Sequence, residues 1–343
     1  MSTPDDVARW TPEERQEFFE QVAAERNLTA IVVEKDFWVC WMPGILFDGP
    51  LRDAMVFKGG TSLSKVYGAI QRFSEDIDLC VNRAELGLSG EPTPEVLTSR
   101  KRRAAHADEV QAACHRWVST TLLPALRADA ARALGTQAFE CDIDANEPGT
   151  IIFAYPVSIT GEERLSNYLK PTVRLELGAR GEGTPADWRE IRSICAEVLP
   201  DTVPGGTVRV FALAAERTFW EKAILTHAEY HRPAASKTPV RLSRHYYDLA
   251  MLARRGVAAT ALRRPDLLTN VVVNTATFFE RTWGSYDTAV PGSLRIVPPV
   301  ERHAELRNDY AAMAEMFFEP EPTFEELLAE LVELERAANA VNH

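Results

Sequence analysis

The chain has 343 residues, of which 45% are hydrophobic, and a formal net charge of −12. This composition excludes a disordered chain, and the length is sufficient for a sizeable core divided over about two domains or lobes. The acidic balance argues against a protein that coats nucleic acid through a broad basic face, but it leaves binding to RNA open.

The cysteines and the apolar segments indicate the compartment. Five cysteines are scattered through the chain without a Cys-x-x-Cys spacing, which argues against a disulfide framework and a zinc ribbon. No apolar run approaches membrane-spanning length, and the acidic N-terminus lacks the basic start of a signal sequence. We therefore expect a cytoplasmic protein without a membrane span.

Two helices are expected before the first strand. The segment Thr11–Glu14 has the pattern of a helix start, with a threonine N-cap and a capping-box glutamate, and this helix should run to about Glu25. A second helical segment, Ala30–Phe47, is rich in aromatic residues, and Pro43 interrupts it. Its aromatic side chains are most simply core residues.

A glycine turn follows the first predicted strand. Met55–Phe57 is a short apolar strand, and apolar residues spaced along one face predict a helix from Thr61 to Gln71. Backbone N–H groups of a glycine turn that opens a helix can face a triphosphate, because no side chain obstructs its approach. The candidate nucleotide-binding residues here are Gly59, Gly60, Thr61, Ser62 and Lys65.

The next predicted strand carries two acids. In Asp76–Val81 the side chains alternate between faces, so Asp76 and Asp78 share one face. Two adjacent carboxylates are costly unless a cation neutralises them, and Mg²⁺ (or Mn²⁺) accepts carboxylates together with phosphate oxygens. Either signal alone is weak, but a glycine turn followed by this acid pair predicts a nucleotidyltransferase site.

These two motifs resemble those of a known family. Phe57–Ser62 (FKGGTS) and Phe73–Asp78 (FSEDID) together are similar to the first motif of the AbiEii/AbiGii group of nucleotidyltransferase toxins, to which the MenT toxins also belong. Glu34–Trp38 resembles a segment that precedes the glycine motif in this family, and we assign it no chemistry. The resemblance covers roughly Glu34 to Leu252. It implies an α+β fold with a polymerase-β-like nucleotidyltransferase core and a mixed sheet, followed by a mainly helical C-terminal lobe.

The middle of the chain is expected to form one long helix and short strands. The helix should run from about Val96 to Leu134, with a kink at Pro124. Strands are expected at Phe139–Asp144 and Ile151–Ile159. Asp142 and Asp144 form a second pair of alternate acids. No glycine turn precedes them, so we place this pair on a solvated sheet edge.

A third acid is a candidate for the site. Pro171–Leu177 reads as a strand that places Arg174 and Glu176 on the face opposite its apolar residues. Polymerase-β-like nucleotidyltransferases set a third acid on a neighbouring strand, and order in the chain makes Glu176 the candidate metal ligand. The alternative is an exposed glutamate that pairs with Arg174 or Arg180.

The second lobe is predicted to be mainly helical. The Gly/Pro-rich break at 200–207 divides the chain into residues 1–205, the nucleotidyltransferase lobe, and residues 206–343, the helical lobe. A last strand, Val208–Phe211, precedes a helix from Ala214 to Tyr230. Further amphipathic helices are expected at Thr260–Arg281, Glu301–Phe318 and Phe324–Asn339.

Two charged residues of this lobe allow more than one interpretation. Lys222 can extend into a cleft and contact a phosphate as a point charge, or it can be a snorkelling surface lysine. Asp248 lies one helical turn from Arg244 in a helix that Ser243 is expected to cap, so the two can simply pair.

The resemblance adds weight to the functional interpretation. Thr218–Lys222 (TFWEK) and Arg244–Leu249 (RHYYDL) are similar to the family's later motifs, whose lysine and aspartate serve the nucleotide site. It implies these roles for Lys222 and Asp248, and it makes His245 a candidate.

The resulting hypothesis is a nucleotidyltransferase that holds NTP between its lobes. Asp76, Asp78, Lys222 and Asp248 would be its catalytic residues, and Asp76, Asp78 and Glu176 its metal ligands. The resemblance implies transfer of NMP to a tRNA 3′ end, which blocks translation, in a toxin–antitoxin or phage-defence system with a cognate antitoxin protein. The alternatives are transfer to a protein or small molecule, and a nucleotide-binding regulatory pseudoenzyme.

Overall fold

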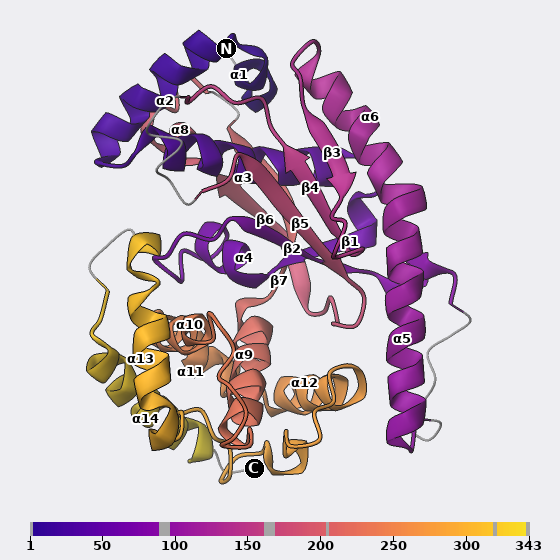
Figure 1. Cartoon of the computed structure of the whole chain (residues 1–343), viewed down its shortest axis with the longest axis vertical. Coiled ribbons are helices and arrows are strands. Elements are labelled where there is room, and N and C mark those ends of the chain that lie inside the picture. Colours follow the sequence, from indigo (N-terminus) through magenta and orange to yellow (C-terminus); the bar gives the residue numbers. More distant parts are fainter. Residues whose placement is uncertain (1–2, 89–96, 161–168, 204–205, 318–320, 341–343) are drawn as a thin grey trace.

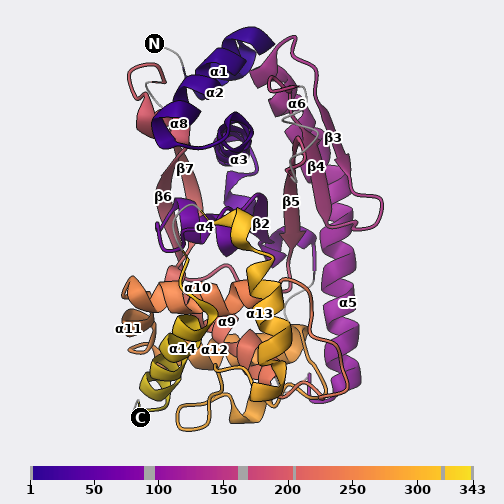
Figure 2. The same ribbon diagram turned by 60° about the vertical axis from the view of Figure 1, so that its left-hand side comes forward.

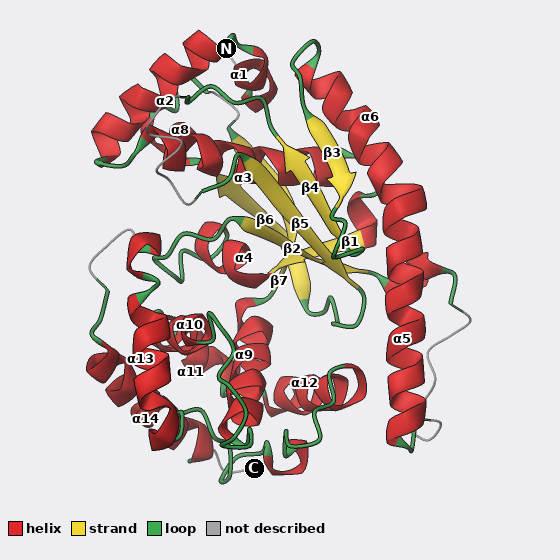
Figure 3. Cartoon of the chain, viewed as in Figure 1, coloured by secondary structure: helices red, strands yellow, loops and turns green. Residues whose placement is uncertain are grey.

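The computed structural model describes residues 3–88, 97–160, 169–203, 206–317 and 321–340. Over these residues the chain has an α+β fold, in which seven strands form one mixed sheet and helices α9 to α14 gather at one end of it (Figures 1 and 3). The predicted fold class is therefore confirmed. The strand order is β3-β4-β5-β2-β1-β7-β6. The strands are β1 Met55–Lys58, β2 Asp76–Val81, β3 Glu140–Ile143, β4 Thr150–Ala154, β5 Thr172–Gly178, β6 Ala186–Arg192 and β7 Thr207–Leu213.

The central strands carry the predicted acids. Strand β2 pairs antiparallel with β1, which sets Asp78 opposite Lys58. On its other side β2 pairs parallel with β5, which sets Asp78 beside Glu176 and Asp76 beside Arg174. Residues at the same register on adjacent strands point to the same face, so these side chains gather on one side of the sheet.

Three helices at the N-terminus cover the sheet: α1 Pro4–Arg9, α2 Pro12–Arg26 and α3 Ala30–Asp48. The predicted capping box at the start of α2 is present. The expected interruption at Pro43 is wrong, because α3 continues through it. A proline inside a helix costs about 3 kcal/mol. Burial of large apolar neighbours, at about 1.5–3 kcal/mol for each side chain, can offset that cost. Such neighbours are Trp41, Met42, Leu46 and Phe47.

The long predicted helix is present in two parts. Helix α5, Arg100–Trp117, passes through a π-helical turn at Val118–Leu122 into α6, Leu123–Leu134. Pro124 stands in the first turn of α6, so the predicted irregularity takes the form of the π turn before it. Val96, the expected start, lies outside the described residues. Helix α5 runs from the sheet to the helical end of the molecule (Figures 1 and 2).

The helices of the C-terminal part pack around a core of their own. The Ala214–Tyr230 and Phe324–Asn339 predictions are confirmed within one residue, as α9 and α14. The single helix expected at Thr260–Arg281 is wrong, because Pro265 begins a new helix there. The helix expected at Glu301–Phe318 is shorter, and residue 318 lies outside the described residues. These helices are α9 Ala215–Tyr230, α10 Ser243–Arg254, α11 Val257–Ala261, α12 Pro265–Phe278, α13 His303–Ala311 and α14 Phe324–Asn339.

The two cores meet near residue 214. Strand β7 belongs to the sheet, and its Val210 and Ala212 lie in the first core, whereas Ala215 lies in the second. The change of core therefore falls after β7, whereas the predicted division of the chain at residue 205 stays a prediction. Leu63 and Ile70, which flank the end of the glycine-turn helix, belong to the second core and tie the two parts together.

Several short elements were not predicted. Strand β6 is an edge strand on which Ile191 alone is buried, so it lacks the alternation that identifies a strand. The other short elements are α8 Ile194–Val198 and the 3₁₀ turns Arg52–Ala54, Arg83–Leu86, Tyr286–Thr288, Val300–Arg302 and Ala314–Met316.

Among the described residues, no helix has the length and apolar character needed to cross a membrane.

A buried histidine on α9 predicts acid sensitivity. His227 Nδ1 accepts a hydrogen bond from the Arg295 backbone N–H at 3.0 Å, and its Nε2 lies 3.0 Å from the Ser285 carbonyl oxygen. Burial lowers the pKa of His227 below 6.5, and nearby His231 and Arg295 add to this effect. The unfolded chain therefore binds a proton that the folded protein resists, so the free energy of unfolding should fall as the pH falls below 6.5.

Urea unfolding at neutral pH and at about pH 5.5 tests this expectation. A His227→Gln protein keeps a side-chain donor and acceptor but does not titrate, so it should lose less stability between the two pH values than the wild type does. Equal losses in the two proteins would show that another group controls the acid sensitivity.

Candidate active site

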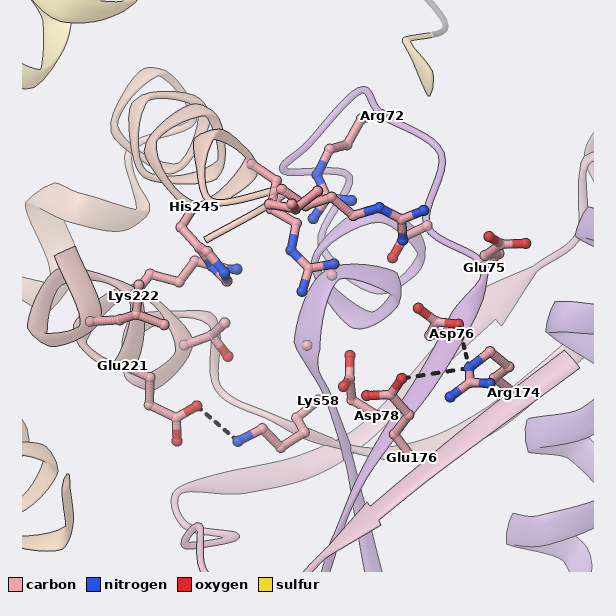
Figure 4. Close-up of a pocket in the computed structure, with 18 of the residues that line it drawn as sticks. Lys58, Arg72, Glu75, Asp76, Asp78, Arg174, Glu176, Glu221, Lys222 and His245 are labelled. Atoms are coloured by element: carbon pink, nitrogen blue, oxygen red, sulfur yellow. Dashed lines mark hydrogen bonds and ion pairs between the residues drawn. The ribbon is translucent and has the colours of Figure 1, made fainter. Parts of the chain in front are cut away.

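A cavity of about 670 Å³ opens between the sheet and helices α9 and α10 (Figure 4). It brings together residues from both parts of the chain, as expected for a ligand held between lobes. Its lining includes eight Lys and Arg residues but five Asp and Glu residues, although the whole chain carries a net charge of −12. The cations are Lys35, Lys58, Arg72, Lys170, Arg174, Lys222, Arg241 and Arg244, and the acids are Glu75, Asp76, Asp78, Glu176 and Glu221.

Three carboxylates face this cavity from two adjacent strands. Burial raises the pKa of Asp76, and nearby Glu75 and Asp78 add to the effect. Burial also raises the pKa of Asp78. For Glu176, burial and then the Asp78 and Asp76 charges raise the pKa to about 7. The three groups therefore repel one another while they lie partly shielded from water.

One arginine lies against this acid group. Arg174 Nε is 3.8 Å from an oxygen of Asp76 and 3.8 Å from an oxygen of Glu176, as the dashed lines in Figure 4 show. Arg174 also pairs with Asp144 at 3.1 Å, so its charge is shared. Glu176 contacts Arg174 and also lies beside Asp78, so its role as a metal ligand stays a prediction.

The acid group fits a divalent cation that binds together with substrate. Within the described part of the chain, no set of three or more His, Cys, Asp or Glu side chains is assembled that could hold a metal ion by itself. Mg²⁺ seldom needs such a set, since it binds through one or two carboxylates plus phosphate oxygens and water. Burial raises the pKa of Asp76 and of Asp78, so a divalent cation at the two carboxylates would favour their charged forms.

The glycine turn packs directly against these acids. Helix α4, Gly59–Lys65, begins at the first glycine and ends well before the predicted Gln71. Gly59 has φ +76°, and a Cβ atom added to it would lie 1.9 Å from Asp78 Oδ2. A Cβ atom on Gly60 would lie 2.9 Å from an Arg72 nitrogen. Both glycines therefore permit close approach of charged side chains, in addition to any approach of substrate.

A Gly59→Ala substitution should displace Asp78 and reduce catalysis. The added methyl group overlaps the carboxylate and also strains a backbone with positive φ. Because a misplacement of about 1 Å can cost about 10²-fold in rate, we expect a loss of at least that size in kcat. Gly256→Ala is a matched control, with φ +78° and no atom within 4 Å of the added Cβ. It should lose stability but keep its activity, and equal activity losses in both variants would contradict the steric argument.

Three of the predicted nucleotide ligands lie away from the cavity lining. Thr61 and Ser62 are buried, and Thr61 Oγ1 donates a hydrogen bond to the Asp76 backbone oxygen at 2.5 Å. Lys65 forms an ion pair with buried Asp36 on α3. The structure brings Gly59, Gly60, Asp76, Asp78, Glu176 and Lys222 to the lining, but not the side chains of Thr61, Ser62, Lys65 or Asp248.

Asp248 instead holds two cations of the lining in place. It is fully buried, and Lys222 Nζ lies 2.8 Å from one of its oxygens. Arg72 donates hydrogen bonds to both oxygens, at 2.8 and 2.9 Å. Burial alone would raise the pKa of Asp248, but Arg72 and Lys222 outweigh it and lower this pKa below its ordinary value. The expected partner on the same helix, Arg244, is not among these contacts, so a tertiary pair replaces the predicted helical one.

Other lining residues were not predicted from the sequence. Lys58 forms an ion pair with Glu221 at 2.9 Å (Figure 4), and Lys35 forms one with Glu75 at 2.9 Å. Lys35 is buried inside α3 and also donates a hydrogen bond to the Lys170 carbonyl oxygen at 3.1 Å. The sequence does contain an indication of Lys35. It lies with Glu34 and Asp36 inside an otherwise apolar helix, and charged side chains are seldom buried unless they are paired.

His245 lies next to these cations. Its Nδ1 is buried and has no hydrogen-bond partner among the described residues. Burial lowers the pKa of His245 well below its ordinary value, and the Lys222 and Arg244 charges lower it further. The imidazole is therefore neutral at physiological pH and can accept a hydrogen bond. Ser243 does not cap this helix as predicted, since it is the first helical residue and Leu242 precedes it as N-cap.

A cavity lined by clustered acids and by several cations is typical of proteins that bind a nucleotide or a related phosphate ligand together with a divalent cation. A sequence model of the family described as "Nucleotidyl transferase AbiEii toxin, Type IV TA system" matches residues 44–330. The chain therefore belongs to the AbiEii family of nucleotidyltransferase toxins of type IV toxin–antitoxin systems. The resemblance inferred from the motifs is confirmed, and the match extends through most of the C-terminal helices.

Comparison with solved structures gives a distant similarity. The chain is similar to MenT4, a nucleotidyltransferase toxin from Mycobacterium tuberculosis H37Rv, with 16% sequence identity and a TM-score of 0.43. The alignment covers 95% of this chain and 99% of that chain. No curated protein sequence matches the chain.

Proposed function

We propose that the protein transfers NMP from an NTP to the 3′ end of a tRNA, with release of pyrophosphate, and thereby blocks translation. The observation that carries the transferase part is the cavity itself, where Asp76, Asp78 and Glu176 face Arg72, Lys222 and Arg244. A triphosphate suits such a site, because its charge offsets the cations and its oxygens complete the shell of a divalent cation.

The residues take distinct roles in this proposal. Asp76 and Asp78 would hold Mg²⁺ (or Mn²⁺), with Glu176 as a third ligand, and the cation would supply charge stabilisation to the transferred phosphoryl group. Lys222 and Arg72 bind phosphate oxygens. Neutral His245, on the same wall, accepts a hydrogen bond from the acceptor hydroxyl and so orients it. Asp248 is a positioning residue, since it contacts Lys222 and Arg72 and is not on the lining.

The acceptor is inferred from the family and from the rim of the cavity. Lys170, Arg241 and Arg244 extend the positive lining and suit the phosphates of an RNA end. A toxin–antitoxin family implies a cognate antitoxin protein as partner, and action on tRNA implies the cytoplasm. The five cysteines are all free and buried, which is consistent with a reducing compartment.

A second candidate acceptor is a protein or a small molecule. The net charge of −12 favours it, because a strongly acidic protein repels RNA outside the cavity. A nucleotide-binding pseudoenzyme is disfavoured, since a site that only binds a triphosphate does not need three carboxylates beside it.

One labelling experiment tests these proposals. The purified protein is incubated with each α-³²P-labelled NTP, Mg²⁺ and total tRNA, beside an Asp76→Ala control, and RNA is resolved from protein on a gel. Label on tRNA that vanishes in the control would establish the transferase and identify the base. Label on protein would establish the second acceptor, and binding of NTP without any transfer would leave the pseudoenzyme.

A further inference from the structure

A second cavity adjoins the candidate active site. Its volume is about 200 Å³, and it lies between helices α9 and α12 and the loop that follows α12. Lys58, Glu221 and Leu225 line both cavities, so these residues form a shared wall. The volume is below the range of about 300–1,000 Å³ found for whole drug-sized ligands, which makes it suitable for one part of a larger molecule.

The lining of this second cavity differs in character from that of the first. Along α9, Ile224 and Ala228 are buried apolar residues, and Val271 faces them from α12. Phe279 and Tyr286 close the cavity from the loop. Such a lining suits a flat, uncharged ring system, whereas the first cavity suits charged phosphates.

An aromatic platform stands at this cavity. Phe279 is 42% exposed, which is unusual for so large an apolar side chain. The Arg180 guanidinium carbon lies 4.9 Å from the centroid of its ring. The Tyr286 hydroxyl donates a hydrogen bond to the Phe279 backbone carbonyl oxygen at 3.2 Å, which ties the Tyr286 side chain to the Phe279 backbone. Aromatic and arginine planes arranged in this way are typical stacking partners of nucleobases.

A buried donor in the lining also lacks a partner. Arg217 is 1% exposed, and its Nη1 donates hydrogen bonds to the Thr184 carbonyl oxygen at 2.8 Å and to Asn270 Oδ1 at 2.7 Å. Its Nη2 has no hydrogen-bond partner in the described portion of the molecule. A buried donor without a partner costs about 1–3 kcal/mol, so an acceptor on a ligand is expected to satisfy it. The carbonyl oxygens and ring nitrogens of nucleobases are such acceptors.

The shared wall connects the two sites. Glu221 lies 2.9 Å from Lys58 and 3.4 Å from the Arg217 Nε, so this carboxylate is held between one cation from each side. Lys58 is also the strand partner of Asp78. A nucleotide with its phosphates at the acids would therefore meet this wall with its sugar and base.

We propose that the cavity between α9 and α12 is a nucleobase pocket, in which Phe279 stacks on the base and Arg217 Nη2 donates a hydrogen bond to it. The proposal rests on the proposed function, since it assigns a base to a molecule whose phosphates occupy the first cavity. The base belongs either to the incoming NTP or to the terminal nucleotide of the acceptor RNA. The pocket then contributes to the choice among bases.

Binding measurements without turnover test this proposal. The dissociation constants of inorganic tripolyphosphate and of each of the four NTPs are measured by calorimetry in Mg²⁺ without RNA. Two variants alter the pocket: Phe279→Ala removes the stacking platform, and Ala228→Leu fills the cavity. Val273→Ala is the control, because Val273 is a 51% exposed residue of α12 outside the lining. The Michaelis constant for total tRNA is measured for each protein in the labelling assay.

If the base of the NTP occupies the pocket, both variants should bind the preferred NTP at least about tenfold more weakly, while tripolyphosphate binding stays within about twofold. If the acceptor base occupies it, NTP binding is unchanged and the Michaelis constant for tRNA rises by a similar factor. If the wild type binds NTP but neither variant changes the dissociation constants or the Michaelis constant for tRNA, the nucleobase pocket is wrong and the proposed function stands. A wild-type protein that binds neither NTP nor tripolyphosphate would instead overturn the proposed function.

Discussion

An Asp78→Asn protein should fold normally and lose transfer activity by at least about 10³-fold. Asparagine keeps the shape of the side chain but removes the negative charge that a bound cation requires. Burial raises the pKa of Asp78, so the fold favours the neutral form of this group. The free energy of unfolding should therefore stay unchanged or increase, which separates a catalytic loss from a folding defect. Asp76→Asn should behave in the same way.

The chain contains a matched control for this pair of acids. Asp142 belongs to the second alternate-acid pair, on edge strand β3, where it forms an exposed ion pair with Arg127. Exposed ion pairs contribute about 0–1 kcal/mol, so Asp142→Asn should keep activity within about twofold and stability within that range. Labelling rates and urea unfolding curves provide both quantities. Activity within tenfold of the wild type in Asp78→Asn would remove the acids from the mechanism.

The parts of this site that the sequence predicts are local. Asp76 and Asp78 were placed on one face by the two-residue period of a strand, and the strand is present with that alternation. Gly59 and Gly60 were identified as a break between a strand and a helix, as observed. Each of these inferences needs only residues that are neighbours in the chain.

The remaining parts depend on tertiary pairing. The sequence allows two interpretations of Glu176, and only the parallel pairing of β2 with β5 sets it beside Asp78. Lys65 was placed at the nucleotide because it follows the glycines, yet helix geometry turns it toward Asp36. Arg72 was missed, since a loop arginine carries no periodic signal and its partner Asp248 lies in another lobe.

An Asp248→Ala protein is expected to lose about 3–5 kcal/mol of stability, because two buried cations lose their shared counterion. The pKa of Asp248 is lowered in the fold by Arg72 and Lys222, so the charged carboxylate stabilises the folded state above its ordinary pKa of 3.8. The surface pair of Asp266 with Arg264, at 2.8 Å, provides a control with the same chemical change. Asp266→Ala should leave the urea unfolding curve close to that of the wild type, because exposed ion pairs contribute little to stability.

Comparison with Lys222→Met separates positioning from direct contact with substrate. This substitution leaves Asp248 bound by two hydrogen bonds from Arg72, so it should destabilise the fold less than Asp248→Ala does. It removes a cation from the cavity lining, however, so it should weaken binding of tripolyphosphate and reduce transfer at least as strongly. A protein in which Asp248→Ala abolishes transfer without any loss of stability would place Asp248 in contact with the substrate. We expect the larger stability loss in Asp248→Ala, because Asp248 is fully buried. We expect the direct loss of phosphate binding in Lys222→Met, because Lys222 lines the cavity.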